Sequence, residues 1–547
     1  MKTKGLMIWL ALLVSCWGTA LADDEVSQAI REQVEQLRGT GQVIIDGASL
    51  AAAGLIPEIY ERRSFQPNWT RTAQVGFLVE AVDDAYEQGL DPSDYHAEQI
   101  RAVHASLAGG QDLTPRRRAD IDLLLTDSLI RLGYHLRFGK VNPEELDPDW
   151  NFRRELAGKD PATIIQQAID SDSLTQFIDQ SLPRGFIYKR LRTALAKYRE
   201  IQAAGGWPTV ADGPALKVGM TDDRVPVLIK RLQASGDLDK SFVPADSRLY
   251  DDAVEQGVKR FQTRHRLVVD GVVGAGTLGA LNVPVEGRVE QIRANLERAR
   301  WVFDDLEDEF IVVNIAAFEV FLVRNREIVW NARAQVGKPY RKTPVFKSTM
   351  KYVVFNPTWT VPPGILAKDI LPNAKRDPGY LATKNIDIRD SNGAVVDPNS
   401  IDWENVSTRN FRYQLVQRPG PTNALGRVKF IFPNTYFVFL HDTPSKSLFE
   451  RPDRAFSSGC IRVESPLDLA ATLLEDKGWD RKRVDATIAS EKTETVFLSK
   501  PLTVALLYFT AGVDDDGTVR FEKDIYERDQ GVIDGLHEDF RVSPPRS

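Results

Sequence analysis

The chain has 547 residues, of which 42% are hydrophobic, and a formal net charge of −7 from 70 Lys and Arg against 77 Asp and Glu. At about 150 residues per domain this length predicts three or four domains, and the hydrophobic fraction is sufficient for ordinary packed cores. An acidic chain without a basic tract is a poor candidate for binding nucleic acid.

The first 22 residues have the features of a secretory signal peptide. Lys2 and Lys4 precede an apolar stretch, 6–14, that is too short to cross a membrane, and 20–22 (Ala-Leu-Ala) offer a small-x-small cleavage site. An alternative stays open, because Leu-Val-Ser-Cys ending at Cys16 resembles a lipobox and would make the protein a lipoprotein. No later segment approaches the roughly 18 uninterrupted apolar residues of a membrane helix, so we expect no transmembrane segment.

Two cysteines are present, Cys16 in the signal and Cys460. The exported chain therefore keeps one thiol and makes no internal disulfide. A lone thiol in an oxidising compartment is open to oxidation unless it is buried or has a chemical role. The residues around Cys460 must therefore distinguish a buried, inert thiol from a reactive one.

Residues 23–215 have a helical pattern and predict a scaffold domain that ends in a linker at 205–213. The apolar residues recur at helical spacing, as in Val26, Ile30, Val34 and Leu37. The histidines of this region, His96, His104 and His135, show neither i,i+4 pairing nor zinc-ligand spacing. We expect neither a catalytic site nor a metal site here.

Residues 216–285 form a second helical unit with a recognisable series of short motifs. These are Leu232-Gln233, Ala253-Val254, Phe261-Gln262, Asp270-Gly271, Gly274, Thr277 and Leu281. Their order closely resembles the type 1 peptidoglycan-binding domain, which implies cell-wall binding, although a spacer role stays open. Residues 274–279 also fit GxGxxG, but no βαβ pattern surrounds them, so we expect no nucleotide cofactor.

The spacing of apolar residues changes from a helical to a strand-like pattern after a charged linker helix predicted at 286–305. Apolar, β-branched runs alternate with turn residues, which predicts antiparallel strands of a domain at 306–500. These runs are 310–313, 318–323, 328–336, 351–355 and 436–440.

A long stretch at 364–428 interrupts this domain and is rich in Pro, Gly, Asn and Asp. Such a stretch inside a domain is usually functional, for example a lid, or else disordered. Residues 501–547 predict a last strand at 504–510, a hairpin turn at 514–517 and a tail.

The chemistry concentrates where the apolar strand at 436–440 ends in His441 and, nineteen residues later, a small-residue turn presents Cys460. A thiol is mostly protonated at neutral pH, and a neighbouring imidazole can take its proton and later return one to a leaving amine. Gly459 allows a tight turn, and the amides of Gly459 and Cys460 can hold a tetrahedral oxyanion.

This combination of His, a gap of under twenty residues and Ser-x-Gly-Cys-x-Arg strongly resembles the YkuD-type L,D-transpeptidases. The segments 356–362, 368–372, 377–380 and 423–426 look like those of the large multidomain members from Gram-negative bacteria. The resemblance implies a multidomain α+β fold: a helical scaffold, a small helical peptidoglycan-binding domain and a mainly-β catalytic domain with a capping insertion. It also implies a periplasmic location.

The resemblance makes Cys460 the nucleophile, His441 the base and the backbone carbonyl of Asp442 the group that orients the imidazole. Arg462 replaces the Asn common in smaller members and is expected to brace the loop or meet a substrate carboxylate. Ser458 stands where smaller members often carry a second His. The expected substrate-binding residues are Arg462, Ser457, Ser458, Tyr436 and Trp359.

The implied reaction is attack by Cys460 on the bond between the third residue and the terminal D-alanine of a tetrapeptide stem, followed by 3→3 cross-linking to a neighbouring stem. Peptidoglycan stem peptides and glycan are the implied partners, with cell-wall synthesis proteins as further partners, and carbapenems are implied inhibitors. No cofactor is expected. An L,D-carboxypeptidase, a lipoprotein-attaching transpeptidase and a non-catalytic wall-binding scaffold remain as alternatives.

Overall fold

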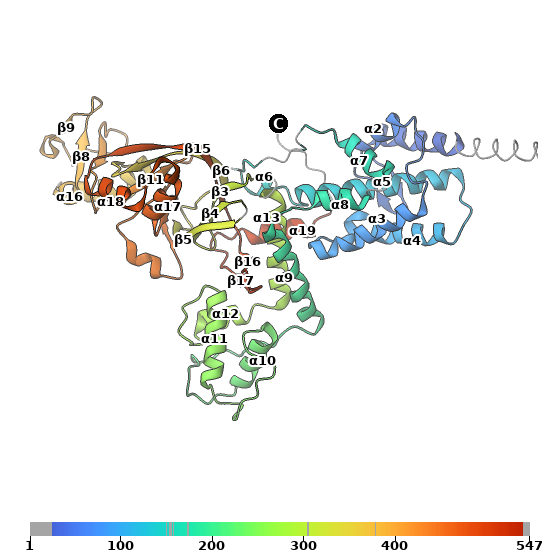
Figure 1. Ribbon diagram of the computed structural model, residues 1–547, viewed down its shortest axis with the longest axis horizontal. Coiled ribbons are helices and arrows are strands. Elements are labelled where there is room, and N and C mark those ends of the chain that lie inside the picture. Colours follow the sequence, from blue (N-terminus) through green and yellow to red (C-terminus); the bar gives the residue numbers. More distant parts are fainter. Residues whose placement is uncertain are drawn as a thin grey trace, which may run out of the picture.

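The computed structural model describes residues 24–539, apart from 149, 153–155, 157, 172–173, 303–305, 326 and 378. The signal-peptide and lipobox interpretations fall outside the described residues. None of the helices in the described part of the chain is long and apolar enough to cross a membrane. Figure 1 shows a helical region, a β-rich region and a small helical domain that projects away from both.

The helical region is built around α5 (Pro115–Phe138), most of which is buried. Thr114 caps this helix by accepting a hydrogen bond from the Arg117 amide, and Pro115 occupies the first turn. A helix over 24–40 and a short hairpin, β1 (Ile44–Ile45) and β2 (Ala48–Ser49), come first. The other elements are α2 (Leu55–Arg62), α3 (Thr72–Asp84), η1 (Tyr86–Gln88), η2 (Pro92–Tyr95), α4 (Ala97–Ala108), α6 (Pro143–Leu146), α7 (Pro161–Asp170), α8 (Leu174–Ser181) and α9 (Phe186–Ala203).

Two of the histidines in this region have structural partners. His96 Nε2 lies 2.8 Å from Asp127 Oδ2, and His135 Nδ1 lies 2.9 Å from the Tyr95 hydroxyl. All four side chains are buried. They hold η2 and the start of α4 against α5.

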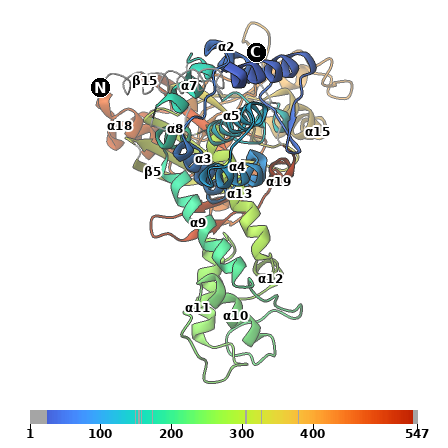
Figure 2. The ribbon, with the colours of Figure 1, turned by 90° about the vertical axis from the view of Figure 1, so that its right-hand side faces the viewer.

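The small helical domain consists of α10 (Val225–Ser235), α11 (Asp252–Arg264) and α12 (Ala275–Leu281) around a hydrophobic core of its own. Its turn at Gly271 has a φ of +71°, which favours glycine, and the Tyr250 hydroxyl donates to the Gly271 carbonyl at 2.6 Å. Two long helices, α9 and α13 (Val285–Val302), run side by side and connect this domain to the rest (Figures 1 and 2).

The helix that we predicted as a linker, α13, is buried over most of its length. Several of its charged residues form ion pairs inside the protein. Glu297 and Arg300 form an ion pair of 2.8 Å with both side chains 0% exposed, and Glu297 also accepts the Val141 amide at 2.7 Å. Because α13 contacts α5, α9 and α19 (Asp529–His537), this connecting helix is also a central support of the fold.

The β-rich region contains a nine-stranded sheet of order β13-β5-β14-β12-β11-β6-β15-β3-β4. Strand β15 (Glu494–Leu507) pairs antiparallel to β6 (Phe346–Phe355) and parallel to β3 (Glu309–Asn314). It runs through the boundary predicted at 500/501, so that boundary is wrong. A register shift between Phe497 and Leu502, around Pro501, explains the error, because proline interrupts a strand pattern in the sequence. The remaining strands are β4 (Glu319–Arg324), β5 (Glu327–Gly337), β11 (Val428–Ile431), β12 (Leu440–His441), β13 (Ala455–Ser457) and β14 (Ile461–Val463), with α17 (Pro466–Leu473), η7 (Glu475–Lys477) and α18 (Arg481–Ala489) between β14 and β15.

The insertion is a folded cap with its own hydrophobic core, which includes Leu371, Leu381 and Trp403. Its sheet has the order β7-β10-β8-β9 and includes β7 (Trp359–Thr360), so the cap begins before residue 364. Its elements are too short to show a clear period in the sequence. They are α14 (Pro363–Ile365), the π-helix η4 (Leu366–Ile370), α15 (Leu371–Arg376), α16 (Gly379–Thr383), β8 (Ile386–Arg389), β9 (Val395–Val396), η5 (Pro398–Ser400) and β10 (Gln414–Gln417).

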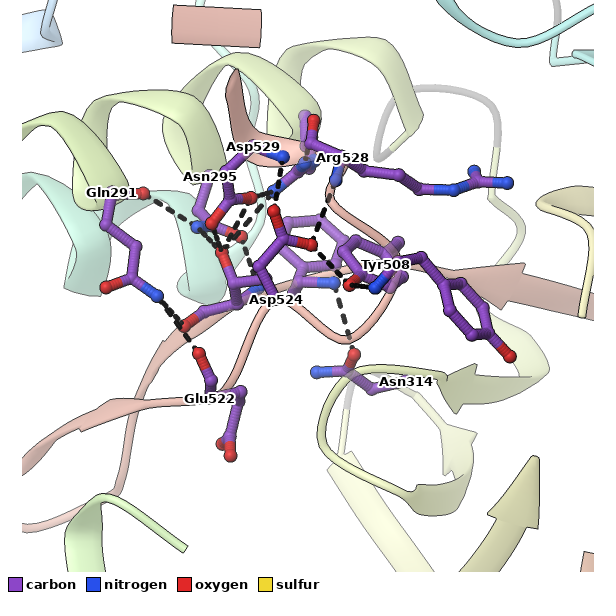
Figure 3. A network of polar contacts seen from close by, with 12 residues as sticks. Gln291, Asn295, Asn314, Tyr508, Glu522, Asp524, Arg528 and Asp529 are labelled. Carbon is purple, nitrogen blue, oxygen red and sulfur yellow. Dashed lines mark hydrogen bonds and ion pairs between the residues drawn. The ribbon is translucent and has the colours of Figure 1, made fainter. Parts of the chain in front are cut away.

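The C-terminal segment after β15 is fixed to α13 by a buried polar network (Figure 3). The Thr510 amide donates to Asn295 Oδ1 at 2.8 Å, and the Thr510 hydroxyl donates to Asp529. The Tyr508 hydroxyl donates to Asp524 and accepts the Tyr526 amide at 2.9 Å. The turn predicted at 514–517 joins β16 (Ala511–Val513) to β17 (Val519–Phe521).

Candidate active site

His441 lies on β12, and Cys460 immediately precedes the adjacent parallel strand β14. His441 ends β12 and is opposite Arg462 of β14, and Cys460 lies two residues before Arg462. Because side chains alternate between the faces of a strand, all three project from one face of the sheet. Leu440 and Ile461, on the opposite face, are fully buried in the core. The loop between the strands contains η6 (Lys446–Glu450) and β13.

The loop before Cys460 is shaped by Ser457, which is 2% exposed. Ser457 Oγ donates to the Cys460 carbonyl at 2.6 Å and accepts the Gly459 amide at 3.0 Å, and Gly459 has a φ of +120°. The Gly459 amide, predicted as an oxyanion donor, is therefore already engaged. Among the described residues nothing accepts a hydrogen bond from the Cys460 amide, which is the donor left for an oxyanion.

The Cys460 thiol is half-buried, and its Sγ donates to the Phe437 carbonyl at 3.6 Å. Burial raises the pKa of Cys460, while the Phe439 amide, Arg462 and Lys429 act in the opposite direction. Phe437 has a φ of +56°, a conformation that is unusual for a bulky residue, and its side chain is 76% exposed. The resting thiol is protonated at neutral pH.

His441 is buried, and its Nδ1 donates to the carbonyl of Asp442. Burial and the charge of Arg462 lower the pKa of His441 to about 3, so the imidazole is neutral at physiological pH. Since a carbonyl can only accept, Nδ1 carries the proton and Nε2 is left as an acceptor. The thiol and the imidazole are not hydrogen-bonded to each other in this state, and such contacts often form only when substrate binds.

The turn that presents the Asp442 carbonyl is held from two sides. Gly426 has a φ of +63°, and a Cβ at this position would overlap the Asp442 side chain. The Asp442 carboxylate accepts the Arg427 amide at 2.8 Å and pairs with Lys446. Gly426 belongs to a segment that resembles the family landmarks, and the close approach of Asp442 gives its physical reason.

The nucleophile loop is also supported by residues distant in sequence. Thr343 Oγ1 donates to the Gly459 carbonyl at 2.8 Å and accepts the Gly337 amide at 2.9 Å. Tyr526, in the C-terminal segment, donates its hydroxyl to the Gly337 carbonyl at 2.6 Å and accepts the Thr343 amide at 3.1 Å. The sequence contains no signal for this support, because each residue is separately an ordinary core or loop residue.

Lys429 is a further residue of the site that the sequence interpretation missed. It lies on β11 directly opposite His441, on the side away from Arg462. Its neighbours Val428 and Phe430 are fully buried in the core, so the alternation of this strand places Lys429 on the face of the thiol. That alternation was available in the sequence, but only the pairing with β12 shows that Lys429 meets the site.

Two of the other predicted substrate-binding residues, Arg462 and Ser458, form hydrogen bonds to different parts of the catalytic domain. Arg462 Nη1 donates to Gln335 Oε1 at 3.1 Å, which fits a bracing role. The Ser458 hydroxyl accepts a hydrogen bond of 2.7 Å from Arg341, which also pairs with Asp369 of the cap at 3.1 Å.

The two predicted aromatic residues contact hydrophobic cores. The ring of Tyr436 packs against Phe346 with centroids 4.9 Å apart, and the backbone carbonyl of the next residue, Phe437, contacts the thiol. Trp359 is opposite Gln417 in the cap and packs against the core of the cap.

Three family models match separate parts of the chain. Residues 54–195 match a scaffold domain, 221–281 a "Putative peptidoglycan binding domain" and 308–488 the YkuD L,D-transpeptidase catalytic domain. The chain thus contains a YkuD L,D-transpeptidase catalytic domain together with scaffold and peptidoglycan-binding domains.

Two individual proteins are similar to parts of the chain. A "Putative L,D-transpeptidase" from Haemophilus influenzae is 38% identical over 243 residues, which are 44% of this chain and 49% of the relative. The match thus spans about half the length of that curated relative. A crystal structure of an L,D-transpeptidase from Xylanimonas cellulosilytica aligns with 54% of this chain and 99% of its own, at 14% identity and a TM-score of 0.17.

Proposed function

We propose that the protein is an L,D-transpeptidase that forms 3→3 cross-links in peptidoglycan. The observation that carries the proposal is that Cys460 and His441 share one face of the sheet, with a neutral imidazole and an unengaged amide at Cys460. A thiol, a base and an oxyanion donor together are the groups that acyl transfer requires.

The chemistry proceeds in two halves. Cys460 Sγ attacks the carbonyl of the third residue in a donor tetrapeptide while its proton passes to His441 Nε2. The oxyanion accepts a hydrogen bond from the Cys460 amide, and D-alanine leaves with the proton from His441, so that a thioester remains. The side-chain amine of the third residue in a neighbouring stem then attacks the thioester, loses its proton to His441, and releases the thiol, which takes that proton back.

The same proposal assigns wall binding to the small helical domain and a periplasmic location to an exported chain. Peptidoglycan stem peptides and glycan are the proposed partners. The match to a peptidoglycan-binding domain at 221–281 supports this assignment, since an acidic chain gains no general attraction to an anionic wall.

The direct test is incubation of the mature protein with tetrapeptide stems, followed by mass spectrometry of the products. We expect release of free D-alanine together with a 3→3 dimer. Release of D-alanine with tripeptide and no dimer would instead identify an L,D-carboxypeptidase, in which water resolves the thioester. A product formed only with a lipoprotein amine would identify the attaching activity.

The cap is expected to favour aminolysis by excluding water from the thioester. Arg341 is the contact that joins it to the nucleophile loop, because it bonds both Asp369 and Ser458. Asp369→Ala should raise the ratio of hydrolysis to cross-linking by about 2- to 5-fold, since a partly exposed ion pair is worth at most about 1 kcal/mol. Glu404→Ala, in an exposed part of the cap, is the control, and an unchanged ratio in the Asp369 variant would exclude this role of the contact.

A further inference from the structure

Two cations flank the proposed base without an anion to neutralise them. Across the sheet, Lys429, His441 and Arg462 are direct neighbours in register. Arg462 donates to the neutral amide of Gln335, and its Nε is buried without a hydrogen-bond partner. In the described part of the chain neither Lys429 nor Arg462 forms an ion pair with a carboxylate. The Lys429 ammonium lies 5.5 Å from the centroid of the Phe439 ring, and the titratable group that acts on both cations is the Cys460 thiol.

Two acidic side chains close to the site in sequence, Asp442 and Glu464, already interact with other residues. Asp442 is bound by Lys446 and the Arg427 amide, and Glu464 pairs with Arg333. Both unpaired cations are partly buried, and burial lowers the pKa of each. Partly buried charges without a partner cost free energy, which an anionic ligand would recover.

The position of the cations limits which substrate group can meet them. Two residues along a strand span about 6.6 Å, which separates the starting point of Arg462 from that of Cys460, and Lys429 starts two strand spacings, about 9.6 Å, further across the sheet. Both long side chains nevertheless bring their charges close enough to act on the Cys460 thiol. A carboxylate in reach must therefore be close to the scissile carbonyl. In a tetrapeptide donor the terminal carboxylate lies one residue, about 3.8 Å in Cα spacing, beyond that carbonyl.

We propose that Lys429, together with Arg462, binds the terminal carboxylate of the donor stem and thereby selects donors that end one residue after the scissile bond. This inference rests on the proposed function and names a specificity residue for it. An additional residue on the donor would carry the carboxylate past the cations, so longer stems would lose the contact. The carboxylate leaves with D-alanine, which frees the cationic site for the next donor.

The test compares a tetrapeptide stem with its C-terminal carboxamide, in wild type, Lys429→Met, Lys429→Arg and Lys351→Met. Lys351 is an exposed lysine of the neighbouring strand β6 and serves as the matched control. The readout is kcat/KM for release of D-alanine or D-alaninamide. Wild type should prefer the carboxylate by about 10- to 100-fold, the range expected for one charge-assisted contact.

Lys429→Met should lose about 10- to 100-fold on the carboxylate and no more than about 3-fold on the carboxamide. Lys429→Arg should keep most of the preference, and Lys351→Met all of it. Equal losses on both substrates, with a higher apparent pKa in the alkylation of Cys460 by iodoacetamide, would show that Lys429 acts on the thiolate instead.

If Lys429→Met fails to fold, the wild-type comparison still decides, because equal rates on the two substrates would overturn the proposal. Failure of the underlying function is distinguishable: wild type would then release neither product. A wild type that accepts a pentapeptide as well as the tetrapeptide would also contradict the selection of donor length.

Discussion

Cys460→Ala is expected to abolish covalent acylation by a carbapenem. Cys460 is the single cysteine after Cys16, and the proposed acyl-enzyme forms at its Sγ. Intact-protein mass spectrometry of the mature wild type should show an increase of one drug molecule, and the Cys460→Ala protein should show none. Ser458→Ala, which removes a neighbouring hydroxyl that bonds Arg341, is the control and should still be acylated.

His441→Gln should slow the same acylation by about 10²- to 10⁴-fold, because it removes the base and leaves the thiol and the Cys460 amide in place. The drug adduct should then appear on a longer time scale rather than disappear. An adduct on Cys460→Ala would identify a different nucleophile. A folded, reduced wild type that forms no adduct would remove the support for catalysis and favour a wall-binding scaffold with an inactive catalytic domain.

Glu297→Ala is expected to cause a large loss of stability. Glu297 and Arg300 are both 0% exposed, so removing one partner leaves a buried charge uncompensated, at a cost of about 3–5 kcal/mol. The lost acceptor also leaves the Val141 amide without its hydrogen bond. For a folding unit of this size the melting temperature should fall by on the order of 10 °C.

Calorimetry or circular dichroism checks this expectation, with Glu286→Ala on the exposed first turn of α13 as the control. A double replacement of Glu297 and Arg300 by methionine should recover much of the loss, because no unpaired charge remains. Equal melting temperatures for Glu297→Ala and Glu286→Ala would show that the buried pair contributes nothing to stability.

The helical and β-rich regions could be predicted from the sequence because their apolar periods are local. His441 could also be placed at the end of a strand and Cys460 in a turn nineteen residues later, since this is a short-range pattern, whereas the strand β14 that follows Cys460 was not predicted. The sequence does not show that the charged helix α13 is also a buried support, because the pairing of Glu297 with Arg300 inside the protein depends on the helices around it. The cap is harder to predict, since its strands and helices are too short to establish a period.

The finer arrangement of the site follows from sheet register, which a single sequence does not contain. Lys429 meets the site only through its pairing with His441, and Tyr526 only through the packing of the C-terminal segment. The engaged amide of Gly459 depends on the rotamer of Ser457. Contacts of this kind join residues far apart in the chain, and neither composition nor periodicity records them.

Because the nucleophile loop depends on Tyr526, the part of the chain needed to position the nucleophile is longer than the matched catalytic domain. A gene fragment that stops at residue 488, where the family match ends, would lack β15 and the tyrosine that holds Gly337 and Thr343 in place. A protein made from such a fragment would contain Cys460 and His441 but would lack the contacts that hold the nucleophile loop in position. The segment that sets the geometry of the nucleophile loop therefore extends at least to Tyr526, beyond the segment that the family model matches.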